Sequence, residues 1–104
     1  MILQIHPKAE NELRAAARWY EQQREGLGIE FFATVDAAMA GIEANPHRAS
    51  RLETWEGEGD VRRVVLPRFP YLVIYEVIND VVHVWSISHS RRKPNYWKSR
   101  RKNP

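Results

Sequence analysis

VRRVVLPRFPYLVIYEVINDVVHVWSISHSRRKPNYW, the segment Val61–Trp97, passes from strand-forming residues to a basic, aromatic end. Its apolar runs are rich in Val, Ile, Tyr and Trp, which suit the pleated surface of a sheet. The pattern predicts three strands, at Val61–Leu66, Tyr71–Ile78 and Val81–Ser88. Pro67 and Pro70 confine the first connection to a loop. Asn79-Asp80 is a two-residue turn of the kind that closes a hairpin with primed geometry.

This turn also predicts the register of the hairpin. The expected pairs are Ile78 with Val81, Val77 with Val82, Glu76 with His83, Tyr75 with Val84, Ile74 with Trp85 and Leu72 with Ile87. Glu76 and His83 then form a cross-strand polar pair. Both faces of the hairpin are mostly apolar, so both need cover. We expect helices on one face, and the C-terminal segment or another chain on the other.

The first 60 residues predict a strand at Ile2–Ile5 and two amphipathic helices, from about Lys8 to Arg24 and from Ile29 to Ala44. Helical spacing selects the residues of each apolar stripe. They are Ala9, Leu13, Ala16 and Tyr20, widened by Trp19, and then Phe32, Val35, Met39 and Ile42, with Phe31 and Ala38 beside them. Gly26 and Gly28 turn the chain, Pro46 ends the second helix, and 47–60 is a surface loop.

The elements predict an α+β fold: an N-terminal strand and an αα-hairpin packed on a mainly antiparallel, twisted four-stranded sheet. A chain of 104 residues is one domain, residues 1–104, and residues 98–104 are expected to form a loosely ordered basic tail. There are no cysteines, no signal-peptide pattern and no apolar run long enough to cross a membrane. These features favour a cytoplasmic protein.

Charge is divided unevenly along the chain. Residues 61–104 carry ten Lys or Arg against two Asp or Glu, a net charge of +8, whereas residues 1–60 carry six against eleven, a net charge of −5. A segment this positive suits an anionic partner, either nucleic acid or an acidic protein segment.

The densest chemical cluster is His89–Trp97, HSRRKPNYW. His can move a proton near neutral pH, Arg can hold a phosphate through two hydrogen bonds, and Tyr or Trp can stack on a base. Cleavage of RNA through its 2′-hydroxyl needs such groups. The residues alone favour a simpler interpretation, in which Tyr96 and Trp97 anchor a basic tail to the core.

Three further arginines, Arg62, Arg63 and Arg68, flank the second predicted strand of the chain, Val61–Leu66. Alternation along the strand puts Arg62 and Arg63 on opposite faces, so only one of them can share a site with Arg91. His6 and His47 are isolated, and no spacing of histidines or carboxylates predicts a metal site or a cofactor.

Taken together, the order and spacing of these residues resemble the RelE/ParE superfamily of type II toxin–antitoxin toxins, often called plasmid stabilisation proteins. The resemblance covers nearly the whole chain. It rests on Ala9, Glu12-Leu13, Ala16, Trp19-Tyr20-Glu21, Gly26-Leu27-Gly28, Phe32, Asn45-Pro46, Val61-Arg62-Arg63, Arg68–Tyr75, Ile87-Ser88-His89, Arg91, Pro94 and Tyr96-Trp97. It implies the fold given above, an acidic antitoxin that blocks the toxin, and repression of the operon through the DNA-binding part of that antitoxin.

The superfamily divides by mechanism. RelE-like members cut mRNA on the ribosome, which implies catalytic roles here for His89, Arg91, Tyr96 and Arg63. Two cationic positions of that branch are Leu72 and Val65 in this chain, which weakens the nuclease interpretation. ParE-like members poison DNA gyrase, and the resemblance favours this branch. Its recognition surface would comprise Arg62, Arg63, Arg68, Arg91, Arg92, Tyr96 and Trp97. A degenerate member that only binds its antitoxin is a further alternative.

Overall fold

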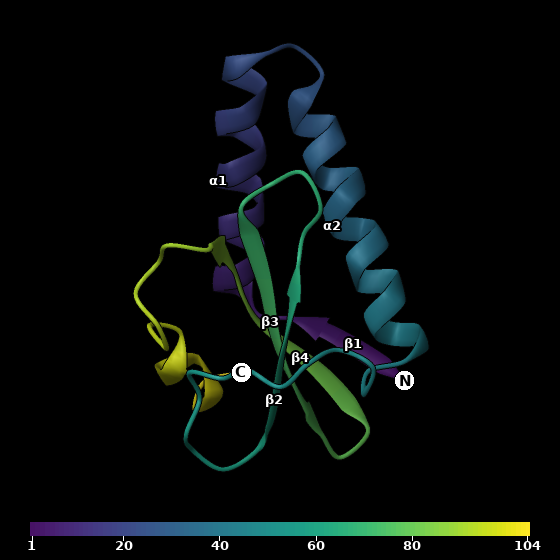
Figure 1. Cartoon of the computed structure of the whole chain (residues 1–104), viewed down its shortest axis with the longest axis vertical. Coiled ribbons are helices and arrows are strands. Elements are labelled where there is room, and N and C mark those ends of the chain that lie inside the picture. Colours follow the sequence, from purple (N-terminus) through teal and green to yellow (C-terminus); the bar gives the residue numbers. More distant parts are fainter.

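The structure is a computed structural model that describes the whole chain, residues 1–104. In chain order the elements are β1 (Ile2–Ile5), α1 (Pro7–Gln23), α2 (Leu27–Ala44), β2 (Asp60–Val65), β3 (Tyr71–Ile78), β4 (Val81–His89) and the 3₁₀ helix η1 (Lys98–Arg101). The strands form one sheet in the order β1-β4-β3-β2 (Figure 1). Only the β1–β4 pair is parallel. The predicted α+β fold with a mainly antiparallel sheet is therefore confirmed.

The helix hairpin forms for local reasons that the sequence carries. Pro7 opens α1, where its missing N–H needs no partner, and the Nδ1 atom of His6 accepts a hydrogen bond from the Lys8 N–H. Gly26 takes a left-handed conformation, with a φ of 86°, and so turns the chain into α2. The α2 helix ends at Ala44, two residues before Pro46.

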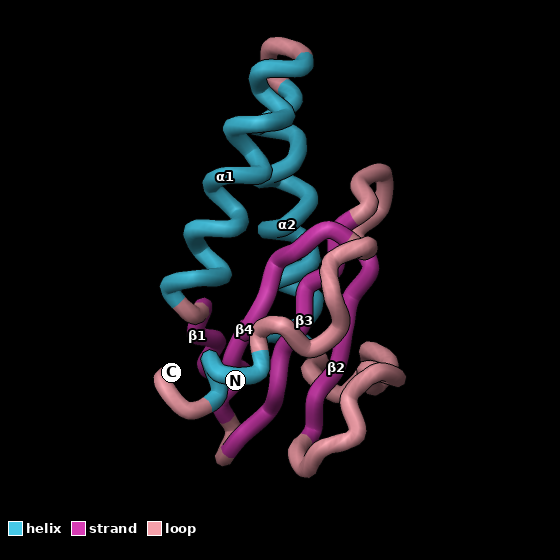
Figure 2. The backbone as a smooth tube through the Cα atoms, turned by 90° about the vertical axis from the view of Figure 1, so that its left-hand side faces the viewer, coloured by secondary structure: helices cyan, strands magenta, loops and turns pink.

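The sheet separates two apolar clusters. The larger cluster packs the helices on one face of the sheet, and the smaller one lies on the opposite face. Figure 2 shows the helices on one side of the strands and the long loop that leads into β2 on the other. The smaller cluster consists of Leu52, Val61, Ile74, Trp85 and Trp97, with Trp55, Leu72 and Tyr96 at its border. The second apolar face of the hairpin is thus covered by the chain's own loop and C-terminal segment.

One residue of the predicted helix stripe is misplaced by a single position. Phe31 is fully buried in α2, whereas Phe32 is 37% exposed. The buried stripe contains Phe31, Val35, Met39 and Ile42, a spacing of four, four and three residues that follows one face of a helix. Trp19, expected to widen the stripe of α1, lies 55% exposed.

The predicted hairpin register is correct near the turn and wrong beyond it. Asn79 and Asp80 both have positive φ, 49° and 64°, as the primed turn requires. Tyr75 pairs with Val84 as expected, but Ile74 pairs with Ser86. Trp85 is an extra residue, and this β-bulge shifts every later pair by one position, so that Leu72 faces Ser88 and not Ile87.

The bulge has a clear packing reason. Val82, Val84 and Ile87 belong to the cluster under the helices, while Trp85 belongs to the cluster on the other face. Strict alternation from Val84 would place Ile87 on the same face as Trp85. The extra residue restores Ile87 to the main core and leaves Ser86 and Ser88 on the opposite face, beneath the C-terminal segment.

The C-terminal end differs from the loosely ordered tail predicted for residues 98–104. Lys98–Arg101 form η1, and the side chain of Arg100 is only 10% exposed. Farther along, the backbone carbonyl of Asn103 accepts a hydrogen bond of 2.8 Å from the Nε2 atom of His6. Composition alone predicted fraying because it does not reveal these distant partners.

Candidate functional site: a cleft under the C-terminal segment

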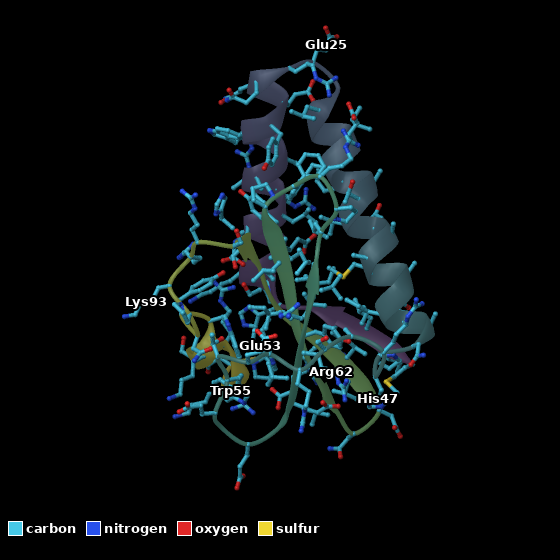
Figure 3. The ribbon with its side chains drawn as sticks, viewed as in Figure 1. Glu25, His47, Glu53, Trp55, Arg62 and Lys93 are labelled. Atoms are coloured by element: carbon cyan, nitrogen blue, oxygen red, sulfur yellow. The ribbon has the colours of Figure 1, made fainter.

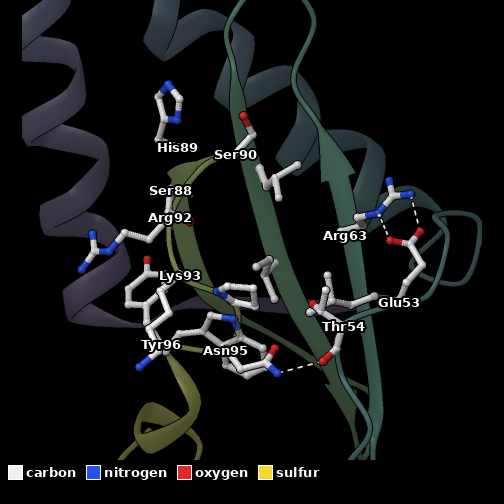
Figure 4. Close-up of a pocket in the computed structure, with 15 residues that line it drawn as sticks. Glu53, Thr54, Arg63, Ser88, His89, Ser90, Arg92, Lys93, Asn95 and Tyr96 are labelled. Atoms are coloured by element: carbon white, nitrogen blue, oxygen red, sulfur yellow. Dashed lines mark hydrogen bonds and ion pairs between the residues drawn. The ribbon is translucent and has the colours of Figure 1, made fainter.

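After β4 the chain crosses the sheet face that the helices do not cover. Between this crossing segment and the loop before β2 lies a cleft of about 290 Å³. Its lining includes Glu53 and Thr54 from the loop, Arg63 from β2, and most of the residues from Ser88 to Trp97 (Figure 4). We call Ser90–Trp97 the recognition segment.

The structure brings some of the predicted site residues together in this cleft and leaves others outside. The ones that line it are Arg63, His89, Arg92, Tyr96 and Trp97, whereas Arg91 does not line it. Arg63 occupies one wall, where it is joined to Glu53, and Arg92 lies with Tyr96 on the opposite wall (Figure 4). The predicted grouping of Arg63, His89 and Tyr96 is therefore found, but Arg91 is separate from it.

Arg62 and Arg68 lie away from the cleft. The guanidinium of Arg62 donates to Asp60 and to the backbone carbonyls of His47 and Ala49, on the face opposite to Arg63. Figure 3 shows Arg62 beside His47, on the other side of the sheet from Lys93. Arg68 pairs with Glu30 of the helix hairpin at 2.7 Å. Arg62 thus ties β2 to the loop before it, whereas Arg68 forms an exposed ion pair with the helix hairpin.

Ion pairing divides the ten basic residues of positions 61–104 into two equal sets. Five have carboxylate partners within the chain: Arg62, Arg63, Arg68, Arg100 and Arg101. Five are exposed and have none: Arg91, Arg92, Lys93, Lys98 and Lys102. The unpaired positive charge of this part of the chain is thus concentrated in the recognition segment and at the two ends of η1, Lys98 and Lys102.

Trp97 is buried, which corrects its predicted role as a target contact. Its side chain has no exposed surface and packs against the tilted ring of Trp55, with 5.2 Å between the ring centroids. The indole N–H has no hydrogen-bond partner, so packing alone holds the ring. This agrees with the simpler sequence interpretation, in which Trp97 anchors the segment to the core.

Tyr96 is committed to internal hydrogen bonds. Its hydroxyl donates to Glu12 of α1 and lies 2.8 Å from the hydroxyl of Ser86. Burial raises the pKa of the Tyr96 phenol, and the hydrogen bond to Glu12 raises it further. The guanidinium of Arg92 lies 4.0 Å from the centre of the Tyr96 ring. The hydroxyl is therefore a protonated donor that points into the protein.

Glu12 and Arg100 are the site residues that sequence reasoning missed. Arg100 donates two hydrogen bonds to the Glu12 carboxylate, of 2.9 and 3.0 Å. Burial alone would lower the pKa of Arg100, but the pairing with Glu12 outweighs it and raises the pKa. A signal for Glu12 was present, because its spacing from Ala9 and Ala16 places a carboxylate on the buried face of α1.

A second arginine–glutamate pair anchors η1, which also contains Arg100. Arg101 donates to both oxygens of Glu76, whose side chain is nearly fully buried, and this pairing raises the pKa of Arg101. Glu76 also accepts from the Nε1 atom of Trp85. The register pairs Glu76 with His83 as predicted, yet His83 stacks on Trp85 and makes no hydrogen bond to Glu76. The expected polar pair is therefore replaced by a Glu76–Arg101 ion pair.

No group of three or more His, Cys, Asp or Glu side chains is placed to hold a metal ion. The helices are too short or too polar for any of them to cross a membrane. The arrangement is thus a positively charged segment held over a shallow cleft by two arginine–glutamate pairs.

Comparison with known structures supports the fold. The isolated E. coli RelE toxin matches with a TM-score of 0.64 at 21% identity, over 99% of this chain and 98% of that one. A chain of the chromosomal ParDE toxin–antitoxin system of P. aeruginosa matches with a TM-score of 0.62 at 20% identity, over 86% and 95%. No curated protein matches at a significant level.

The family is shown by the sequence comparison. The family described as "ParE toxin of type II toxin-antitoxin system, parDE" matches residues 3–94, which include the helix hairpin, all of the sheet except Ile2, and the start of the recognition segment. The chain belongs to the ParE toxin family of type II toxin–antitoxin systems.

Proposed function

We propose that this toxin stops growth by binding DNA gyrase, that it acts as a recognition protein in the cytoplasm, and that a cognate antitoxin neutralises it. The observation that carries the proposal is the commitment of the nuclease candidates to internal partners. Tyr96 donates to Glu12, Arg63 is bound by Glu53, and Arg91 lies outside the cleft. Because the chain belongs to the ParE toxin family, we expect its target to be DNA gyrase.

RNA cleavage would need donors that are free to meet the charge that develops on the phosphate. The ion pair with Glu53 instead raises the pKa of Arg63 and lowers the pKa of Glu53. The Arg63 guanidinium is thus already paired within the chain. Leu72 and Val65 stand where the nuclease branch carries cations, so the sheet supplies no replacement. Loss of one such donor typically costs about 2.7–4 kcal/mol in the transition state.

His89 is the remaining candidate for a general base, and its geometry opposes that role. The Nδ1 atom of His89 accepts a hydrogen bond of 3.1 Å from the Arg91 N–H. A neutral imidazole with an acceptor at Nδ1 carries its proton at Nε2. The nitrogen that is free to face a substrate is therefore already protonated, which is unsuited to removing a proton from a 2′-hydroxyl.

The five free cations supply what a recognition protein needs. A surface with one sign of charge speeds association with a partner of the opposite sign and aligns the two before contact. An acidic antitoxin would compensate the same charge, and operator DNA would be reached only through that antitoxin. No cofactor or metal enters this function.

The test runs two assays on one preparation of purified toxin: supercoiling by DNA gyrase, and cleavage of mRNA on programmed ribosomes, each with and without antitoxin. The proposal expects gyrase inhibition that the antitoxin relieves, with intact mRNA. Cleaved mRNA with unaffected gyrase would instead identify the ribosome-dependent endoribonuclease and return attention to His89. A chain that is inactive in both assays, yet binds its antitoxin, would be the degenerate member of the family.

A further inference from the structure

The edge of β4 lacks a strand partner for part of its length. The short strand β1 pairs with β4 only as far as Ile5 opposite Val84, and the His6 N–H makes the last backbone bond, to the Val84 carbonyl. The bulge at Trp85 follows directly. Backbone groups of a buried strand that lose their ladder need other partners.

Two side chains supply these partners. The Arg100 guanidinium donates to the Trp85 carbonyl at 2.8 Å, and the Ile87 N–H donates to the Glu12 carboxylate at 3.1 Å. Arg100 and Glu12 are themselves paired. The Arg100 guanidinium thus supplies the donor, and the Glu12 carboxylate the acceptor, that the backbone of a neighbouring strand would otherwise offer.

Glu12 is saturated as an acceptor. Its Oε1 atom receives the Ile87 N–H and one Arg100 N–H, while Oε2 receives the Tyr96 hydroxyl and another Arg100 N–H. A carboxylate offers about four acceptor directions, and all four are used here. These donors come from the β4 edge, from the recognition segment and from η1, so one side chain of α1 joins three parts of the molecule.

We propose that Glu12 is the positioning residue of the recognition segment: by holding Tyr96, Arg100 and the Ile87 N–H together, it sets where the cations from Arg91 to Lys98 stand relative to the sheet. The structural part of this proposal is independent of the target. Its functional part rests on the proposed binding of gyrase.

Stability alone does not account for this arrangement. Glu12 and Arg100 are only 17% and 10% exposed, and buried ion pairs can often be replaced by apolar residues without loss of stability. An apolar residue at position 12 would pack against the elements around α1, but it could not accept hydrogen bonds from the Tyr96 hydroxyl and the Ile87 N–H. What the carboxylate contributes is a defined geometry for the segment that follows β4.

The central variant is Glu12→Gln, which keeps the size of the side chain and removes its charge. The matched control is Glu10→Gln, which removes the same charge from the same helix, where Glu10 forms an exposed pair with Arg14. Antitoxin binding and circular dichroism report whether each variant folds. Amide hydrogen exchange of Ile87 and of residues 96–103 reports positioning, and ¹³C NMR of the Tyr96 ring carbon that bears the hydroxyl reports the bond to Glu12.

We expect exchange at these amides to rise about 10–100-fold in Glu12→Gln, because hydrogen bonds to a charged group are weakened. The Tyr96 carbon should shift, and about tenfold more toxin should be needed for half-inhibition of gyrase. Glu10→Gln should match the wild type in every measurement.

The possible results separate the two parts of the proposal. Unchanged exchange in a folded Glu12→Gln protein overturns the positioning role whatever the target. Faster exchange with undiminished gyrase inhibition overturns only the functional part. A wild-type toxin that leaves gyrase unaffected contradicts the proposed function and leaves the exchange result to be judged by itself.

A second variant keeps the test decisive if Glu12→Gln fails to fold. Arg100→Lys retains the charge but loses the planar fork that reaches both oxygens of Glu12 and the Trp85 carbonyl. Faster exchange confined to residues 85–87 and 96–103 supports the proposal. Wild-type exchange there contradicts it.

Discussion

The Tyr96 hydroxyl donates a hydrogen bond to the Glu12 carboxylate, and so joins the C-terminal segment to α1 across 84 residues of chain. The two residues lie in different layers, because α1 covers one face of the sheet and the recognition segment crosses the other. Their bond passes beside the β4 edge where β1 has ended.

Replacing Tyr96 by Phe should lower the free energy of unfolding by about 1.5–3 kcal/mol, the usual contribution of a hydrogen bond to a charged group. The aromatic ring and its contact with Arg92 remain. Urea denaturation measures the change as a lower midpoint with an unchanged slope. Tyr20→Phe is the matched control, because no hydrogen bond of the Tyr20 hydroxyl is present; an equal loss in both variants would show that the Glu12 bond is not the cause.

Alkaline pH should reduce the stability that Tyr96 contributes. The pKa of Tyr96 is raised in the folded protein by burial and by Glu12. A group whose pKa rises on folding contributes fully below its unfolded pKa, about 10, and loses that contribution as the pH rises toward its folded pKa. The difference in stability between the wild type and Tyr96→Phe should therefore be constant from pH 7 to 9 and shrink above pH 10. A difference that stays constant up to pH 11 contradicts this assignment.

The fold could be predicted from sequence because its signals are local. The strand Tyr71–Ile78 is as predicted, both helices end within two residues of their expected positions, and the primed turn at Asn79-Asp80 needs only its two residues. The bulge was harder to predict. Its signal is a change in spacing, because the core residues Val82 and Val84 are two apart whereas Val84 and Ile87 are three apart.

The site could not be predicted to the same depth, since it depends on partners that the sequence does not order. Arg63 and Arg100 look alike in the chain, yet Arg63 finds Glu53 ten residues away and Arg100 finds Glu12 at a separation of 88. Local pattern reveals that a segment is basic. Only the packed structure tells which cations already have carboxylate partners, as Arg62, Arg63 and Arg68 do.

Trp97→Ala should unfold much of the smaller cluster and not merely remove a contact. Deleting a fully buried aromatic side chain typically costs about 3–5 kcal/mol. We expect a lower unfolding midpoint and weakened antitoxin binding together with any loss of toxicity. Trp19→Ala, at a half-exposed tryptophan, should cost about 0.5 kcal/mol or less. A Trp97→Ala protein of wild-type stability that has lost only gyrase inhibition would restore Trp97 as a recognition residue.

Removing free cations should weaken target binding without harming the fold. Arg91 and Lys93 are exposed and unpaired, so Arg91→Ala and Lys93→Ala should leave the unfolding midpoint within about 0.5 kcal/mol of the wild type. Each should raise the toxin concentration needed for half-inhibition of gyrase, chiefly by slowing association.

The dependence on salt distinguishes this explanation from a change in shape. Exposed charges are screened over about 10 Å at 0.1 M salt and about 3 Å at 1 M, so the gap between the wild type and each variant should narrow as salt rises. Lys8→Ala is the matched control, because Lys8 is also an exposed, unpaired cation but lies in α1, outside the recognition segment. If Lys8→Ala weakens inhibition as much as Lys93→Ala does, overall charge and not the recognition segment governs binding. If the effect of Lys93→Ala persists at high salt, its side chain makes a short-range contact, and the electrostatic account of this surface fails.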